Sequence, residues 1–336
     1  CDAGREGELI FKHVYDLSGS KKPVKRLWIS SLEDSAILDG MQHLRSAEEY
    51  RHLAEAAVCR SQADWLVGMN ATRAYTTKYF KKLTVGRVQT PTLAMLVERA
   101  GQISNFQKEK YFNVELDCEG IPAIKPKIFD PDEAEQLRSR CHGNEAIVTS
   151  VKETEKKVKA PKLYDLTTLQ REANRKYGYS AKQTLNIMQR LYENHKVLTY
   201  PRTDSRYIGK DIVPTIKERL RACATGPYRK PAGALMNQPV RANGSFVDDK
   251  KVSDHHAIIP TEQYASLTSF SSDERKIYDM VVARFLAVLS APAISEQLSV
   301  KASINGELFR AKAENIKQMG WRELYEEETQ TKDTIK

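Results

Sequence analysis

The spacing of the apolar residues changes several times along this chain of 336 residues, so one uniform fold cannot accommodate it. Residues 1–48 alternate between helix-like and strand-like stretches, which is typical of an α/β layer. Residues 50–100 have helical spacing, whereas residues 105–160 contain stretches that alternate apolar and polar residues or are β-branched, as strands do. The length also exceeds that of an ordinary single domain. We therefore expect about two to four domains, of α/β and α+β class.

Residues 163–205 form the most clearly patterned small module. Apolar residues at helical spacing over 166–173 predict one helix, and Ser180 with Gln183 has the capping-box pattern that predicts the start of another. A strand-like stretch that ends at Tyr200 follows. The order helix, helix, strand is typical of winged-helix DNA-binding domains.

The rest of the pattern predicts further elements. They are a helix up to Gly19, a strand over 26–29, a helix that begins at a Ser31–Asp34 capping box, a helix capped by Thr90 with Pro91 in its first turn, an exposed lysine-rich connection over 152–162, a loop over 225–252, a helix over 274–289, and strands over 296–303 and 308–313.

The charge balance favours a nucleic-acid partner. Lysine and arginine total 53 against 44 aspartate and glutamate, which gives a formal net charge of +9 and a pI near 9.1. No apolar run approaches the roughly 20 residues of a membrane-spanning helix, and no signal peptide begins the chain, so we expect a cytoplasmic protein with no membrane partner. The five cysteines are scattered without a Cys-x-x-Cys pair, which argues against a disulfide framework and a zinc site.

Residues 199–205 read Thr-Tyr-Pro-Arg-Thr-Asp-Ser and make Tyr200 a candidate nucleophile. A phenol has a pKa of about 10, so it needs a nearby cation or base to react at neutral pH. Arg202 can supply that charge, and its planar fork can hold two phosphate oxygens and stabilise a five-coordinate phosphorus. The alternative is that Tyr200 is an aromatic strand residue that precedes a turn with a solvated charge cluster. The local pattern leaves both interpretations open.

An acidic cluster opens the chain. Asp2, Glu6 and Glu8 stand beside Gly4 and Gly7 at a predicted strand-to-helix turn. Crowded carboxylates repel one another unless a cation offsets them, and hard oxygen ligands at a tight turn suit Mg²⁺. The alternative is a helix N-terminus whose acids favour the helix dipole.

Two further segments could present polar side chains to a phosphate. Residues 86–92 place polar side chains at a helix N-terminus, where free amides already favour an anion, although an ordinary helix start explains the pattern equally well. The helical segment before it contains two arginines, which a surface ion pair between Arg60 and Asp64 would also explain. The candidates are Arg60, Asp64 and Arg73 in one segment and Arg87, Gln89 and Thr90 in the other.

Residues 254–261 contain the adjacent histidines His255 and His256. Adjacent side chains seldom reach one ion, and no third ligand stands at a familiar zinc spacing. A histidine that donates to a phosphate oxygen, or adjusts the proton balance near Tyr200, is the preferred interpretation.

Taken together and in this order, five segments resemble those of type IA DNA topoisomerases. The residues of several of them resemble the topoisomerase III branch in particular. Residues 2–8 resemble the second acidic motif of the Toprim fold, residues 64–73 and 86–94 resemble the helical domain that holds single-stranded DNA, residues 198–204 resemble the active-site tyrosine segment, and residues 254–261 resemble its histidine segment. The resemblance covers essentially the whole chain.

The resemblance implies a mechanism of strand passage without ATP. Tyr200 would attack one strand to form a 5′-phosphotyrosine, Arg202 would position the tyrosine and the phosphate, and His255 would contact the phosphate region. Asp2 and Glu6 would hold Mg²⁺, which this family uses mainly for resealing, so Glu6 also counts as catalytic. The residues that would line the groove for the strand are Arg60, Asp64, Arg73, Arg87, Gln89 and Thr90.

The resemblance also implies a division into domains that form part of a toroid, whose tyrosine domain lifts away to open a gate. The expected parts are the C-terminal part of a Toprim α/β layer over 1–48, a helical single-strand-binding domain over 49–104, the first part of a β-rich arch domain over 105–160, a winged-helix-like tyrosine domain over 161–291 and the second part of the arch over 292–336. We expect a monomer, associated with the nucleoid, that acts on DNA and prefers single-stranded segments. A helicase is a candidate partner.

Two departures from the family pattern limit these implications. Gly4 stands where the family often has a second aspartate, which removes one metal ligand. The front of the Toprim domain, with a glutamate and a lysine that the family places against the tyrosine, is absent, so we expect a fragment.

A non-catalytic single-strand-binding module or degenerate paralogue, and a Toprim nuclease or primase, remain alternatives. Asp2 and Glu6 argue against a tyrosine recombinase, which attaches to the 3′ end without an acidic metal motif.

We predict that the isolated 336-residue chain does not relax supercoiled DNA, whereas the longer protein that contains it does. The reason is that the expected acid-base partners of Tyr200 are not in this sequence. A gel assay of negatively supercoiled plasmid with Mg²⁺ tests both proteins side by side, and robust relaxation by the isolated chain would contradict the prediction.

Overall fold

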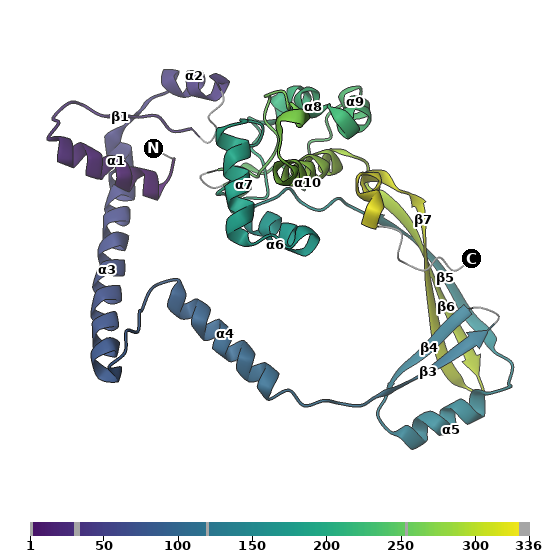
Figure 1. The fold of residues 1–336 in the computed structure, drawn as a ribbon. Helices are drawn as coiled ribbons and strands as arrows, with labels where there is room; N and C mark the ends of the chain where they lie inside the picture. Colours follow the sequence, from purple (N-terminus) through teal and green to yellow (C-terminus); the bar gives the residue numbers. More distant parts are fainter. Residues whose placement is uncertain (1–2, 30–33, 119–120, 253–254, 329–336) are drawn as a thin grey trace. The chain divides into compact units, whose positions relative to one another are not determined.

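The computed structural model describes residues 3–29, 34–118, 121–252 and 255–328, and it divides into two compact units, Cys1–Glu109 and Lys110–Lys336 (Figure 1). The first unit is mostly helical, and the second combines a helical cluster with an antiparallel sheet. The expected mixture of helices and sheet is therefore confirmed at this coarse level. Among the described residues, no helix is both long and apolar enough to cross a membrane.

The first unit begins with α1 (Arg5–Ser18), which ends at Gly19 as the sequence predicts. Gly19 has a φ of 64°, in the left-handed region that glycine enters at little cost. Glu8 of α1 forms a 2.9 Å ion pair with Arg26 of the short strand β1 (Lys25–Arg26), and both side chains are nearly buried. This pair fastens the helix to the strand.

The remaining elements of the first unit confirm the helical prediction for residues 50–100. The strand predicted over 26–29 is shorter than expected, because only Lys25 and Arg26 pair with the neighbouring strand. The predicted capping serine, Ser31, lies outside the described residues. The elements are β2 (Arg45–Ser46), α2 (Asp34–Gln42), the 3-10 turn η1 (Ala47–Tyr50), α3 (Arg51–Tyr79) and α4 (Gln89–Ser104).

The second unit contains a five-stranded antiparallel sheet in the order β3-β4-β7-β6-β5 (Figure 1). The strands are β3 (Phe112–Cys118), β4 (Ile121–Ile128), β5 (Ile147–Val158), β6 (Ala293–Ile304) and β7 (Glu307–Gln318), and the helix α5 (Pro131–Cys141) packs on β3 and β4. The last two strands confirm the prediction and extend beyond it. They form a hairpin whose turn residues Asn305 and Gly306 have φ values of 49° and 84°, as a type I′ turn requires.

The prediction of an exposed connection over 152–162 is wrong for residues 152–158, which continue β5. They pair antiparallel with β6, as far as Val158 opposite Ala293. β5 is an edge strand with exposed side chains, and charged residues on an edge deter pairing with another chain. Because lysine and glutamate fill positions where an inner strand carries apolar residues, the sequence shows no apolar alternation there.

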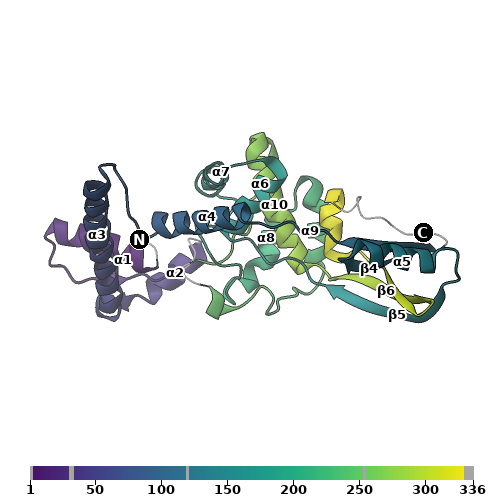
Figure 2. The same ribbon diagram turned by 90° about the horizontal axis from the view of Figure 1, so that it is seen from below.

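The helical cluster of the second unit packs around the buried helix α10 (Ser272–Leu289), which confirms the helix predicted over 274–289 (Figure 2). Ser180 caps the helix that begins at Ala181, as predicted, because its hydroxyl accepts from the Gln183 amide at 3.1 Å. The other helices and 3-10 turns are α6 (Leu166–Tyr177), α7 (Ala181–Glu193), α8 (Ile216–Cys223), α9 (Arg229–Met236), η2 (Val213–Thr215), η3 (Gly226–Tyr228), η4 (Asp249–Lys251), η5 (Leu267–Ser269) and η6 (Gly320–Glu328).

Two predictions for this cluster are wrong. The loop predicted over 225–252 contains α9, in which Pro231 fits the first turn and Ala232 is buried. The strand predicted to end at Tyr200 is reduced to a single bridge between Leu198 and Pro260. Proline has no N–H to extend a ladder, which limits the pairing at this point.

Glu274 joins α7 to the start of α10. Its carboxylate accepts from the amide and hydroxyl of Ser271, both at 2.8 Å, and from Arg190 Nε of α7 at 2.7 Å. Burial opposes ionisation of Glu274, but Arg190 and Ser271 outweigh it and hold the pKa at about 2. A carboxyl with a lowered pKa stabilises the fold above its unfolded pKa of about 4.3, and this contribution is lost as the pH falls through the folded pKa.

We predict that Glu274→Gln lowers the free energy of unfolding of the second unit by about 3 kcal/mol at pH 7. The difference from the wild type should shrink as the pH falls from about 5 to 2, because protonation then removes the same charge from the wild type. Urea unfolding followed by Trp321 fluorescence, with Trp28 and Trp65 replaced by phenylalanine, measures it. Asp279→Asn, which breaks a partly exposed pair with Arg275 on the same helix, is the control and should cost less than about 1 kcal/mol. A difference that stays constant with pH would contradict the assignment.

Candidate active site

Tyr200 is half-buried, and its ring is held by aromatic neighbours. The ring of His255 lies against it, with centroids 4.3 Å apart and an interplanar angle of 38°. The edge of Tyr192, from α7, meets it at 5.5 Å and 78°. Aromatic pairs at these separations are attractive and have a defined geometry. The structure therefore brings together two of the predicted catalytic side chains, Tyr200 and His255.

The main chain before Tyr200 is fixed to the histidine segment by a buried threonine. The Thr199 amide donates to the Ile259 carbonyl at 3.0 Å. The Thr199 hydroxyl accepts from the Ile259 amide at 3.0 Å and donates to the Ala257 carbonyl at 3.2 Å. Thr199 is 8% exposed, so these groups have little access to water. This one side chain satisfies two buried backbone groups of the opposite segment and sets the register that places Tyr200 beside His255.

The residues after Tyr200 alternate between buried and exposed. Thr203 and Ser205 point inward: the Thr203 hydroxyl donates to the His255 carbonyl at 3.0 Å, and the Ser205 hydroxyl donates to the Lys251 carbonyl at 2.7 Å. Arg202 and Asp204, between them, are exposed. Among the described residues, no hydrogen-bond or ion-pair partner is found for the Arg202 guanidinium. Its donors are accessible to an anion from solution.

The two adjacent histidines have different surroundings. His255 is half-buried against Tyr200, whereas His256 is 4% exposed and its Nδ1 lies 2.7 Å from the Ala257 carbonyl. Asp254 lies outside the described residues. Only His255 stands where it could act together with Tyr200.

Three other tyrosines of the second unit, Tyr164, Tyr179 and Tyr278, are buried, and Tyr228 is partly buried; raised pKa values make these four unsuited to nucleophilic attack. Burial, with a smaller contribution from Asp273, raises the pKa of Tyr179 to about 12. Burial also raises the pKa values of Tyr164, Tyr228 and Tyr278. A phenol that stays protonated is a poor nucleophile.

The two described acidic residues of the motif, Glu6 and Glu8, have different surroundings. Glu8 is used in the nearly buried pair with Arg26, whereas Glu6 is exposed and forms ion pairs with Arg60 and, at 3.5 Å, with Arg5. Asp2 lies outside the described residues. Mg²⁺ is commonly held by one or two carboxylates together with waters and substrate phosphates, but Glu6 is engaged by Arg60, and no group of three or more metal-binding side chains occurs in the described part of the chain. The magnesium site therefore stays a prediction that depends on Asp2.

The predicted strand-binding residues of the first unit form pairs different from those expected. Asp64 of α3 pairs with Arg87 at 2.9 Å, not with Arg60, because the loop before α4 folds back along α3. Two threonines of α3 hold that loop: Thr72 Oγ1 accepts from the Val85 amide at 3.0 Å, and Thr76 Oγ1 accepts from the Leu83 amide at 3.2 Å.

The start of α4 also differs from the prediction. Thr90 does not cap this helix; its hydroxyl accepts from the Gly86 amide at 3.1 Å and closes the preceding turn. Gln89 Oε1 accepts from the Thr84 hydroxyl at 3.1 Å. Arg73 is exposed on α3. The polar residues of this segment thus shape the loop, with Arg87 and Arg73 at its surface.

Sequence reasoning missed Tyr207, whose phenol accepts from Lys162 Nζ at 2.6 Å. The pKa of Tyr207 is lowered, chiefly by this hydrogen bond and also by the charge of Lys251. No signal in the sequence could have found the contact, since Lys162 lies 45 residues before Tyr207.

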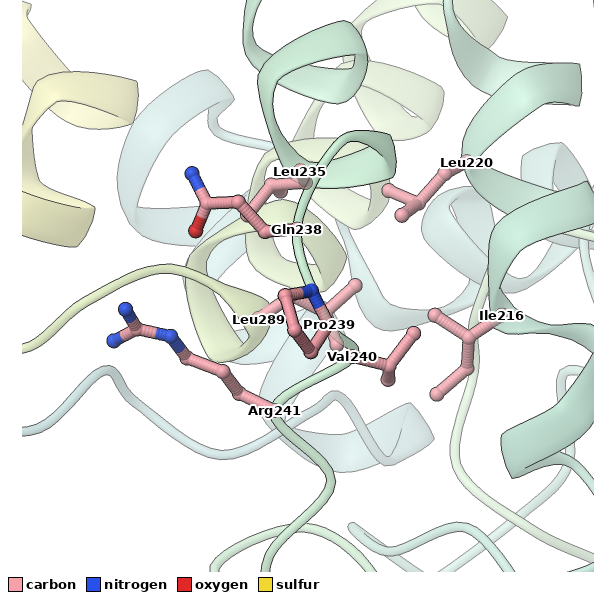
Figure 3. A pocket seen from close by; sticks show the side chains of 8 residues that line it. All are labelled: Ile216, Leu220, Leu235, Gln238, Pro239, Val240, Arg241 and Leu289. Atoms are coloured by element: carbon pink, nitrogen blue, oxygen red, sulfur yellow. The ribbon is translucent and has the colours of Figure 1, made fainter.

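A small pocket lies apart from these residues, among α8, α9 and α10 (Figure 3). Its volume of about 10 Å³ has room for roughly one water molecule. None of the residues discussed above lines it; the lining residues are Ile216, Leu220, Leu235, Gln238, Pro239, Val240, Arg241 and Leu289.

Known proteins match this chain over most of its length. The family model described as DNA topoisomerase matches residues 48–336. The chain is 49% identical over 332 residues to DNA topoisomerase 3 of Bacillus cereus (strain ZK / E33L) and 46% identical over 332 residues to DNA topoisomerase 3 of Bacillus subtilis (strain 168). Each match covers 97% of this chain and 46% of the relative, so the chain spans about half the length of these relatives.

Among solved structures, full-length topoisomerase I from Thermotoga maritima is similar, with a TM-score of 0.76 over 99% of this chain and 55% of that chain. The sequence identity is 24%, so this likeness shows the fold alone.

We predict that Thr199→Val lowers the free energy of unfolding of the second unit by about 2 kcal/mol, because it leaves the Ile259 amide buried without its acceptor. Thr199→Ser keeps the hydroxyl and is the matched control, with a loss of about 1 kcal/mol for the missing methyl group. Urea unfolding measures the loss, and hydrogen exchange of the Ile259 amide should speed up in the valine variant only. Equal effects of the two substitutions would show that the hydroxyl is not what holds the segments together.

Proposed function

This chain belongs to the DNA topoisomerase family, as a type IA member of the topoisomerase III branch, and from that membership we propose that Tyr200 is the nucleophile that cleaves one DNA strand. The observation that carries the proposal is the arrangement of Tyr200 on a rigid buried frame, beside His255 and two residues before the exposed Arg202. The whole protein would pass a strand through the break and reseal it.

The proposed reaction exchanges one phosphodiester for another. The Tyr200 oxygen attacks the phosphorus, the bond to the 3′ oxygen breaks, and the phenol proton leaves as the 3′ hydroxyl is protonated. The DNA 5′ end is then joined to Tyr200 as a phosphotyrosine. Because the number of phosphodiester bonds is unchanged, no ATP is needed, and attack by the 3′ hydroxyl reverses the step.

Two side chains of the second unit would serve this step. Arg202 is exposed and has a planar set of donors, which suits it to hold the phosphate oxygens and stabilise the five-coordinate phosphorus. His255, whose ring lies against that of Tyr200, would donate a hydrogen bond to the phosphate region.

The first unit would hold the DNA strand and a metal ion. We propose that Arg60, Asp64, Arg73, Arg87, Gln89 and Thr90 line the strand-binding groove. Arg87 and Arg73 are exposed and can contact phosphates directly, whereas Thr90 would act by shaping the loop that carries Arg87. Mg²⁺ would require Asp2 beside Glu6, and Glu6 would first have to leave Arg60.

The domain assignment extends the same proposal. Residues 1–48 would form the C-terminal part of a Toprim domain, 49–104 part of a helical single-strand-binding domain, 105–160 and 292–336 two parts of an arch domain, and 161–291 the winged-helix-like tyrosine domain. The whole protein would act as a monomer in the nucleoid, on DNA with single-stranded segments, and a helicase is its proposed partner.

We predict that Tyr200→Phe in the longer protein abolishes the covalent adduct with DNA and leaves single-strand affinity within about twofold of the wild type, because only the attacking oxygen is removed. The measurement is a denaturing gel of labelled single-stranded DNA, quenched during the reaction. Tyr264→Phe, at an exposed tyrosine that follows the histidine segment, is the matched control and should keep the adduct. A protein that forms no adduct even as wild type would instead be a binding module without catalysis, and an adduct that persists in Tyr200→Phe would place the nucleophile elsewhere.

A further inference from the structure

Tyr207 lies between two lysines that come from different parts of the chain. Lys162 Nζ donates to its hydroxyl at 2.6 Å and lies 4.8 Å from the ring centroid. Lys251 Nζ lies 4.7 Å from the same centroid. The tyrosine is 9% exposed, whereas Lys162 and the Lys251 side chain are exposed. Both ammonium groups thus lie within 4.8 Å of the centre of one buried ring.

The charges at this cluster are not balanced. Asp248 pairs with Lys251 at 2.8 Å and offsets one of the two ammonium groups, which leaves a net charge of about +1. Asp249, in the same turn, pairs with Lys210 at 3.7 Å and does not offset Lys162. The lowered pKa of Tyr207 has the same cause, because these surroundings favour negative charge at the phenol oxygen. An anion that approaches the two lysines gains the same stabilisation.

The cluster is fixed to the frame that holds Tyr200. The Tyr207 carbonyl accepts from the Ala257 amide at 2.8 Å, and Ala257 is the residue whose carbonyl Thr199 binds. Lys162 stands two residues before Tyr164, which forms a bridge with Ile258. The backbone segments that carry the two lysines are thus hydrogen-bonded to the tyrosine and histidine segments, in the case of Lys251 through the bond that its carbonyl accepts from the Ser205 hydroxyl.

We propose that Lys162, Tyr207 and Lys251 form a binding site for a backbone phosphate of single-stranded DNA, distinct from the phosphate that Tyr200 attacks. This inference rests on the proposed function, since it takes DNA as the ligand. Lysine ammonium groups bind phosphate oxygens as point charges without sequence preference. The site would hold the strand in register while Tyr200 acts on it, and Tyr207 would orient Lys162.

The test is the salt dependence of single-strand binding by the 336-residue chain, measured by fluorescence anisotropy of a labelled oligo-dT. The double variant Lys162→Gln, Lys251→Gln should bind roughly five- to tenfold more weakly near 0.1 M salt, and its log–log salt slope should fall by about 0.7, the value for one lost phosphate contact on single strands. The double variant Lys162→Arg, Lys251→Arg retains both charges and should bind within about twofold of the wild type.

Lys276→Gln is the matched control. Lys276 also lies over tyrosine rings, 5.4 Å from that of Tyr177 and 5.7 Å from that of Tyr179, but it belongs to α10 and not to this cluster. It should leave the slope unchanged. An unchanged slope in the glutamine double variant, or an equal fall in Lys276→Gln, would overturn the proposed site.

Failure of this inference can be separated from failure of the proposed function. If the wild-type longer protein forms the Tyr200 adduct but the lysine substitutions leave the salt slope unchanged, the phosphate site alone is wrong. If the slope falls as expected but no adduct ever forms, the site binds DNA and the proposed nucleophile is wrong.

Discussion

The candidate site depends on one buried segment, residues 255–261, whose backbone groups must all find partners inside the protein. Ala257, Ile258 and Ile259 are at most 1% exposed. Their amides donate to three different parts of the chain: the Tyr207 carbonyl, the Tyr164 carbonyl and the Thr199 hydroxyl. On the acceptor side, Arg219, itself fully buried, donates to the Pro260 carbonyl at 2.8 Å. An apolar segment that excludes water thus dictates the positions of the segments that carry the chemistry.

In this arrangement the side chains that hold the backbone in place differ from those that could contact a substrate. The threonine and serine hydroxyls around Tyr200 all donate inward to backbone carbonyls, so they are not available to a substrate. Arg202 projects outward between Thr203 and Pro201, both buried. The ring of Tyr200, packed against His255 and Tyr192, loses little further conformational entropy in the reacting state, which is what positioning of a nucleophile requires.

Much of this fold could be predicted from local signals, and the failures have a common cause. Apolar periodicity and caps identified α6, α7, α10, β6 and β7, because these elements bury one face against a core. Residues 152–158 of β5 and the whole of α9 were missed, since the former is the charged part of an edge strand and the latter contains proline and glycine. Two motifs pointed to Tyr200 and His255, which the structure brings into contact. The contact between Lys162 and Tyr207 and the pairing of Arg60 with Glu6 join residues distant in sequence. Such contacts follow from tertiary packing and leave no local pattern.

The ion pairs of the first unit differ in a way that bears on the proposed function. The pair between Glu8 and Arg26 is nearly buried, and loss of one partner there would leave an uncompensated charge at a cost of several kcal/mol, on the order of 3–5. The pair between Glu6 and Arg60 and that between Asp64 and Arg87 include exposed side chains, and such pairs contribute about 0–1 kcal/mol. Arg60 and Arg87 can therefore exchange a carboxylate for a DNA phosphate at little cost, which would in turn free Glu6 for a cation. Within the proposed function, the weakness of the two pairs would let the first unit bind and release a strand.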